Sequence, residues 1–130
     1  MASQFSYNRK EKLKSRKQLE SLFAGGKSFL VFPVKVFYMQ QEHTGVNAGV
    51  GVSARNFKKA VQRNRIKRLL REHYRLNKQE LHTFMETQAY GVAVFFLYIG
   101  RELPEKDLLG QKMPQVLNRL IKELGNEKHP

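Results

Sequence analysis

Hydrophobic residues along this chain repeat with two periods, and the first stretch has the helical one. Ser15 and Gln18 have the spacing of an N-terminal capping box, and Gly25-Gly26 can end the segment because glycine takes the left-handed conformation without strain. We therefore predict a short helix before Gly25, with the apolar stripe Leu19, Leu22 and Phe23.

Later segments have the composition of strands. Residues 29–39 are rich in valine and aromatic residues, with Pro33 near the start or on an edge, and this run can divide to give a third early strand. Residues 46–52 predict another long strand, in which Gly49 and Gly51 either loosen the strand or let a second backbone or a ligand approach. Residues 90–99 are almost wholly apolar, which is typical of a strand covered on both faces.

Residues 57–77 predict the longest helix, and residues 78–86 either extend it or form a loop. A closing amphipathic helix is predicted over residues 113–124, with Pro114 near its start and Gly125 after its end. Alternating helices and strands favour one sheet with helices packed on it. One side of the long helix can pack against that sheet, because its apolar residues recur at i, i+3, i+4 and i+7: Ile66, Leu69, Leu70 and His73.

The other side of the same helix is cationic. Residues 55–78 hold ten Lys and Arg but one acid, Glu72, whereas surface helices usually mix both signs. Like charges four residues apart destabilise an isolated helix by roughly a few tenths of a kcal/mol per pair, so this helix makes most sense when phosphate neutralises it. Arginine suits that partner because its planar fork holds two phosphate oxygens at once. The main ladder is Arg63, Lys67, Arg71 and Arg75, with Asn64 and Arg68 as a second row.

The bulk composition agrees with a polyanionic partner. The chain has 130 residues, 41% of them hydrophobic, and a formal charge of +13 from 24 basic and 11 acidic residues. These values predict one domain with a modest core that attracts anions. There is no cysteine and no evident secretory signal, and the longest apolar run, residues 89–99, is shorter than the roughly 20 residues that span a bilayer. We therefore expect a soluble, cytoplasmic protein.

A second basic cluster occupies residues 9–17, with Glu11 as its single acid. Two interpretations stay open: residues 1–12 are a flexible, solubilising basic arm, or this arm becomes ordered on RNA.

Aromatic residues gather around the first helix and strand, and most of them can be core. Successive residues of a strand face opposite sides, so Phe37 and Tyr38 cannot both be buried on one face. The second face can serve as a platform on which the bases of a single strand stack. The group is Phe23, Phe29, Phe32, Phe37 and Tyr38.

The sequence shows no recognisable arrangement of catalytic side chains. Ser53, His73 and the few acids do not suggest a nucleophile–base set, and His73 reads as a packed residue on the apolar side of its helix. The segment from Gly25 to Ser28 lacks the first glycine of a phosphate-binding loop. No metal-ligand spacing links the scattered histidines, which are His43, His73, His82 and His129.

These residues resemble a known family, the protein subunit of bacterial ribonuclease P. The signature is the Arg63-Asn64-Arg65 core within residues 60–72, and flanking pieces agree at residues 13–16, 26–28 and 49–53. The resemblance extends from about residue 7 to residue 124. The connection from Ser53 to Lys59 is one residue longer than the family pattern.

The resemblance implies a fold and a function. The fold is α+β, a single-domain αβββαβα sandwich with one mixed sheet and a left-handed βαβ crossover. The function is to bind a catalytic RNA subunit and the 5′ leader of precursor tRNA, so that the leader is removed by endonucleolytic cleavage. The catalytic groups are then on the RNA, which also binds most of the Mg²⁺, and this chain has no catalytic residue, no metal ligand and no small-molecule cofactor.

Site residues are implied position by position. The leader would lie in a cleft between the first helix and the sheet, lined by Leu19, Phe23 and Phe37, where the family often has an aromatic at the position of Leu19. The RNA-binding residues would be Arg55, Lys58, Lys59, Arg63, Asn64, Arg65, Lys67, Arg68, Arg71 and Arg75.

Two other functions compete with this interpretation. A non-enzymatic RNA-binding module, of the ribosomal or RNA-chaperone type, would share the basic helix and the fold class. A self-contained protein nuclease would cleave RNA without an RNA subunit, although the dispersed acids of this chain offer few ligands for two-metal chemistry.

Overall fold

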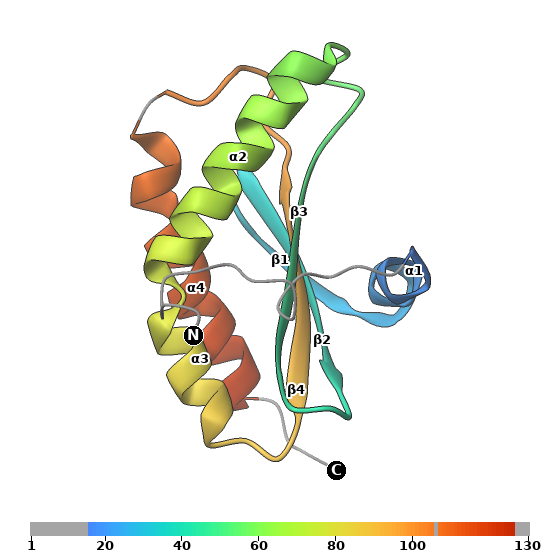
Figure 1. The fold of residues 1–130 in the computed structure, drawn as a ribbon, viewed down its shortest axis with the longest axis vertical. Helices are drawn as coiled ribbons and strands as arrows, with labels where there is room; N and C mark the ends of the chain where they lie inside the picture. Colours follow the sequence, from blue (N-terminus) through green and yellow to red (C-terminus); the bar gives the residue numbers. More distant parts are fainter. Residues whose placement is uncertain (1–15, 106, 127–130) are drawn as a thin grey trace, which may run out of the picture.

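The computed structural model describes residues 16–105 and 107–126, and Figure 1 shows a sheet between two helical layers of unequal size. The expected arm at residues 1–12, Ser15 of the capping box and His129 lie outside the described residues. The elements, in chain order, are α1 (Arg16–Gly25), β1 (Lys27–Val31), β2 (Val34–Gln41), β3 (Gly45–Val52), α2 (Ala60–Asn77), α3 (Gln79–Glu86), β4 (Gly91–Tyr98) and α4 (Leu108–Asn126).

The four strands form one mixed sheet in the order β1-β2-β4-β3. The predicted division of residues 29–39 is confirmed, because a turn at Phe32-Pro33 separates β1 from β2 and the two strands pair antiparallel. β2 also pairs antiparallel with β4, whereas β3 and β4 are parallel and are joined through α2 and α3. This arrangement confirms the α+β class with helices packed on a mixed sheet; the hand of the crossover stays a prediction.

The two faces of the sheet are covered differently. α2, α3 and α4 lie on one face and α1 on the other (Figure 1). The core lies under the three-helix layer, where Val36, Val94 and Phe96 of the central strands are fully buried. Tyr38 is buried on that side while Phe37 contacts Phe23 of α1, so the predicted opposite orientation of this pair is confirmed.

The prediction that residues 90–99 are covered on both faces is only partly correct. The residues of β4 that face the three-helix layer are buried, but Phe95 and Leu97 on the α1 side stay half-buried. The reason is that α1 has 10 residues and crosses only part of this face.

The long basic helix begins at Ala60 rather than at residue 57 and ends at Asn77 as predicted. Its buried residues are Ile66, Leu70 and Tyr74, while Leu69 and His73 are half-buried. The periodicity predicted a buried side of the helix that included His73, whereas the buried side is centred on residues at i, i+4 and i+8 and includes Tyr74 instead. Residues 78–86 form neither a loop nor a simple extension: α3 is a separate helix that starts after Lys78, a residue only 3% exposed.

The closing helix starts earlier than predicted, at Leu108, and Gly125 lies inside it rather than after it. Pro114 is consequently in the helix interior, where it leaves the carbonyl of Gly110 without its usual intrahelical donor. The expectation that proline marks a helix start failed because α4 buries Leu109 before Pro114, and this contact favours an extra helical turn. No helix within the described ranges is long and apolar enough to cross a membrane.

Gly91 should be the least replaceable glycine of the sheet. A β-carbon added there would fall on the carbonyl oxygens of His43 and Gly45, and backbone atoms cannot move aside cheaply. We expect Gly91→Ala to lower the free energy of unfolding by about 3 kcal/mol, the upper end for overpacking, in urea titrations followed by circular dichroism. Gly25→Ala is the matched control, because nothing lies within 4 Å of its added β-carbon and its stability should be equal or slightly higher. Equal stabilities of the two variants would contradict this view of the β3–β4 junction.

Candidate nucleic-acid interface

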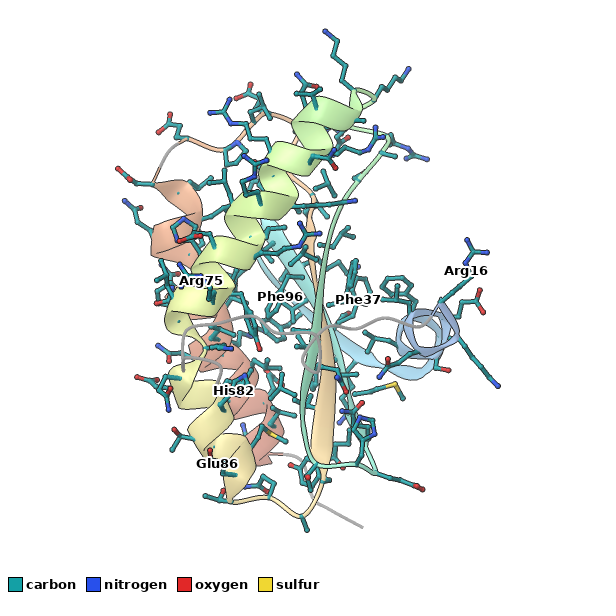
Figure 2. The ribbon with its side chains drawn as sticks, in the orientation of Figure 1. Arg16, Phe37, Arg75, His82, Glu86 and Phe96 are labelled. Carbon is teal, nitrogen blue, oxygen red and sulfur yellow. The ribbon has the colours of Figure 1, made fainter. Side chains whose placement is uncertain are left out.

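The cations of α2 differ in how far they reach solvent. Arg65, Arg68 and Arg71 are exposed, as is the neutral Asn64, whereas Arg63, Lys67 and Arg75 are half-buried. In Figure 2 the sheet residue Phe96 lies on the α2 side of the sheet, and its ring centroid is 5.5 Å from that of Tyr74. Burial of the Tyr74 side of the helix thus turns the Arg65 and Arg68 side outward.

Arg63 does not belong to the exposed row. Its Nη1 donates hydrogen bonds to the carbonyl oxygens of Phe57 at 2.9 Å and Lys58 at 2.7 Å. Phe57 is a core residue, 4% exposed, so these bonds tie the start of α2 to the connection that precedes it. The ladder predicted as one surface therefore contains a structural member, Arg63, at its first position.

The remaining cations form a surface with little internal compensation. Arg75 pairs with Glu72 at 2.7 Å, but no carboxylate in residues 16–105 or 107–126 pairs with Arg65, Arg68 or Arg71. We call the exposed residues Asn64, Arg65, Arg68 and Arg71 the α2 surface. Unpaired guanidinium groups side by side on one helix are a strong site for a polyanion.

The positive surface continues beyond the start of α2. Lys59 is the N-cap residue and makes no side-chain capping bond, so the helix begins with free N–H groups and the positive end of its dipole. Arg55, Lys58 and Lys59 are exposed around this end. The structure therefore brings the predicted residues of the connection next to those of the helix.

A second surface lies on the opposite face of the sheet. Phe23 of α1 is 48% exposed, and its ring meets Phe37 edge-on at a centroid distance of 5.0 Å and Phe95 at 5.3 Å. We call Phe23, Phe37 and Phe95 the aromatic face; in Figure 2, Phe37 points toward α1. Lys35 adds a cation 5.2 Å from the centroid of Phe37. Leu19, one helical turn before Phe23 on α1, is half-buried. Of the three predicted cleft residues, Phe23 and Phe37 are in contact with each other. The cleft itself stays a prediction.

Sequence reasoning missed Phe95. It lies in an almost wholly apolar run, so hydrophobicity alone did not show which residues face α1. Register would have shown it, because Phe95 pairs with Phe37 across the β2–β4 ladder and shares its face.

Gly51 lets the aromatic face form. A β-carbon at Gly51 would lie 2.5 Å from Cζ of Phe95, so the ring rests directly against the backbone of β3. The alternatives open for the β3 glycines were a loosened strand or the approach of a backbone or a ligand. The structure shows neither at Gly51, because β3 is regular from Gly45 to Val52 and the group that approaches is the side chain of Phe95.

A polar network borders the aromatic face, and the sequence patterns gave no signal for it. Gln41 Nε2 donates to Asn47 Oδ1 at 2.8 Å, and Gln18 Nε2 of α1 donates to Gln41 Oε1 at 3.3 Å. His43 Nε2 also lies 2.8 Å from Asn47 Oδ1. These side chains connect α1 with β2 and β3 and position α1 over the sheet.

The histidines and acids do not form a metal site in the part of the chain that the structure describes, where no three of them gather within reach of one ion. His82 instead pairs with the hydroxyl of the buried Tyr74 at 3.1 Å, and His73 lies against Gly110 of α4.

Comparison with known proteins places this fold in a family. A profile of the family described as Ribonuclease P matches residues 7–121. The chain is 34% identical over 119 residues to a "Ribonuclease P protein component" of Porphyromonas gingivalis, a match that covers 89% of this chain and 87% of that protein. It is 31% identical to the protein of the same description from Chlorobium phaeobacteroides, over 88% of each chain.

Solved structures agree on the fold. The ribonuclease P protein of Staphylococcus aureus superimposes with a TM-score of 0.57 at 22% identity, covering 88% of this chain and 94% of that one. The ribonuclease P protein of Thermotoga maritima gives a TM-score of 0.56 at 22% identity, covering 92% and 99%.

The contrast between Arg63 and Arg68 can be tested on stability alone. We expect Arg63→Ala to lower the free energy of unfolding by about 1–2 kcal/mol, because two backbone carbonyls lose a charged donor. Arg68→Ala, the matched control on the exposed side, should change it by less than about 0.5 kcal/mol. Thermal and urea unfolding would measure both, and a larger loss for Arg68→Ala would show that the α2 surface is structural.

Proposed function

Because this chain belongs to the ribonuclease P protein family, we propose that it binds the catalytic RNA subunit with its α2 surface and the 5′ leader of precursor tRNA with its aromatic face. The chain is thus a subunit of a ribonucleoprotein endoribonuclease, and the proposal concerns how its residues serve that enzyme. The observation that carries it is the separation of an unpaired cationic surface and a partly exposed aromatic surface onto opposite faces of one sheet.

The cationic side suits a folded RNA. Duplex and packed RNA strands present closely spaced phosphates, and one guanidinium group can donate two parallel hydrogen bonds to the oxygens of a phosphate. The α2 surface offers three arginines without internal partners among the described residues. Arg63 has a positioning role, since it holds the turn that carries Lys58. The residues that we propose to contact the catalytic RNA, or in the case of Arg63 to position such contacts, are Arg55, Lys58, Lys59, Arg63, Asn64, Arg65, Lys67, Arg68, Arg71 and Arg75.

The aromatic side suits a single strand. Unpaired bases stack on exposed aromatic rings with little sequence preference, and Lys35 beside Phe37 can meet the phosphate of a stacked nucleotide. Mature tRNA has no leader, so a protein surface for the leader would favour binding of substrate over product. In this proposal Phe23 and Phe37 touch the leader, while Leu19 supports Phe23 from the preceding turn of α1.

We assign the hydrolysis to the RNA subunit. Magnesium prefers oxygen ligands, and RNA phosphates supply them at the site of cleavage. The contribution of this chain is then electrostatic and positional: its cations reduce the repulsion between RNA strands that must approach each other, and its aromatic rings fix the leader. Processing of precursor tRNA would place the protein in the cytoplasm.

The competing functions lose their support once the family is known. A ribosomal or chaperone-type module and a self-contained nuclease would each share only part of the pattern, whereas the family profile covers residues 7–121.

Salt dependence tests the α2 surface. If 6–10 phosphates are contacted, affinity for the catalytic RNA should fall by roughly 10³–10⁵ between 50 and 200 mM salt, by analogy with duplex DNA. Arg65→Ala and Arg68→Ala should each weaken binding and reduce the log–log salt slope by about 1, with unchanged melting temperature. Filter binding at several salt concentrations gives the slopes. Glu80→Gln on α3 is the control that leaves the surface intact, and a flat salt response of the wild type would remove the electrostatic basis of the proposal.

Leader discrimination tests the aromatic face. The reconstituted protein–RNA complex should bind precursor tRNA more tightly than mature tRNA, and Phe37→Ala should narrow that ratio by about 5-fold or more, because one base stack contributes roughly 1–3 kcal/mol. Leu76→Ala on α2 is the control, since it removes an apolar side chain of similar size, 46% exposed, far from this face. Equal binding of both tRNAs by the wild-type complex would contradict a role in leader binding.

A further inference from the structure

One cavity lies outside both surfaces. It has a volume of about 680 Å³ and opens where β4 ends, between the β1–β2 turn, residues 99–105 and the first turns of α4. Phe32 and Pro33 line it from the turn, Ile99 and Gly100 from the end of the strand, and Lys112 from α4. None of these residues is required by the proposed contacts of α2 or of the leader.

Hydrogen bonds hold the walls of this pocket in place. The backbone N–H of Ile99 donates to the carbonyl of Pro33 at 2.9 Å, which joins the strand end to the turn. The Tyr98 hydroxyl donates to the carbonyl of Glu102 at 2.7 Å and folds residues 99–102 over its ring. Burial, and to a lesser degree the charge of Glu102, raise the pKa of Tyr98. A β-carbon at Gly100 would collide with the Tyr98 ring, so the pocket is preformed around that glycine.

The lining selects for a flat, amphipathic ligand. Phe32 is 61% exposed and Leu103 is 38% exposed, and both present apolar surface to the cavity. Two exposed carboxylates, those of Glu102 and Glu105, also line it and can accept hydrogen bonds from the amino groups of a ligand. A nucleobase matches this combination, because its faces stack on aromatic rings and its amino groups donate to carboxylate oxygens.

The cations that line the pocket point to RNA as the source of the base. Arg101 and Lys112 line the cavity as cations that can meet the flanking phosphates. Asn56 Nδ2 donates to the carbonyls of Ile99 at 3.2 Å and Gly100 at 3.3 Å, so the pocket wall is bonded to the basic connection that carries Arg55 into α2. These bonds therefore fix the pocket wall to the connection that leads into α2.

We propose that this pocket receives an unpaired purine base of the catalytic RNA, stacked on Phe32, with its adjacent phosphates held by Arg101 and Lys112. Of the two base classes, a purine is the stronger stacking partner, because its larger ring system makes more dispersion contacts with the apolar side chains around it. The inference rests on the proposed function, since it needs the catalytic RNA to lie along α2. It adds a base-stacking contact to the electrostatic contacts of the α2 surface.

Tryptophan fluorescence can test the pocket directly, because the chain contains no tryptophan. Phe32→Trp keeps an aromatic ring for stacking and makes it the single reporter; its emission should be quenched when the catalytic RNA is added. Leu30→Trp on the same hairpin is the matched control, since Leu30 is 47% exposed and does not line the cavity, and its emission should change little.

Affinity gives a second, independent measurement. Phe32→Ala should weaken binding of the catalytic RNA by about 5- to 150-fold, the range of one base–aromatic stack. The salt slope should stay at the wild-type value, which separates this loss from the reduced slope of Arg65→Ala. Leu30→Ala should bind like the wild type. Melting temperatures of all variants should match, and if Phe32→Ala is unstable, Phe32→Trp still decides the question because it must bind with wild-type affinity.

The outcomes separate the two proposals. If the wild type and Phe32→Trp bind the catalytic RNA normally and the tryptophan emission does not change, the pocket has no base in it and this inference is wrong. Quenching by precursor tRNA alone, but not by the catalytic RNA, would overturn it as well. If the wild type does not bind the catalytic RNA at all, the proposed function fails, and this inference fails with it.

Discussion

Burial of Ile66, Leu70 and Tyr74 against the sheet orients α2, and the rest of the functional arrangement depends on that contact. These three residues repeat every four positions and pack over the parallel β3–β4 pair, where Tyr74 meets Phe96. Once this side is buried, Arg65 and Arg68 must face away from the core. The exposed cations therefore owe their positions to apolar residues between them.

The magnitudes explain why a helix so rich in cations is stable. Three fully buried side chains contribute roughly 1.5–3 kcal/mol each, whereas like charges four residues apart cost roughly a few tenths of a kcal/mol per pair. The ladder contains three such pairs, so the apolar side outweighs the repulsion severalfold. A structure with a net charge of +13 can thus keep a concentrated positive surface without a polyanion, and the repulsion is relieved when phosphate binds.

Sequence patterns predicted much of this structure because strong periodicity marks the elements that carry the core. The division of residues 29–39, the end of α2 at Asn77 and the opposite orientations of Phe37 and Tyr38 follow from local rules. The misses have tertiary causes. Pro114 lies within a helix because Leu109 reaches the core before it, and Arg63 bonds backbone carbonyls that only the folded connection presents. Family resemblance, rather than periodicity, pointed to α1 as part of a binding surface, and it did not include Phe95.

Strand β4 links the two proposed surfaces through its two-residue period. Phe96 faces the three-helix layer and packs under Tyr74 of α2, while its neighbour Phe95 faces α1 and contacts Phe23. A slip of one residue in the pairing of β4 would exchange these faces, because successive side chains alternate. It would place Phe95 under α2 and remove the ring that Gly51 accommodates on the other side. The same register that seals the core therefore also sets the distance and orientation between the surface proposed for structured RNA and the surface proposed for a single strand.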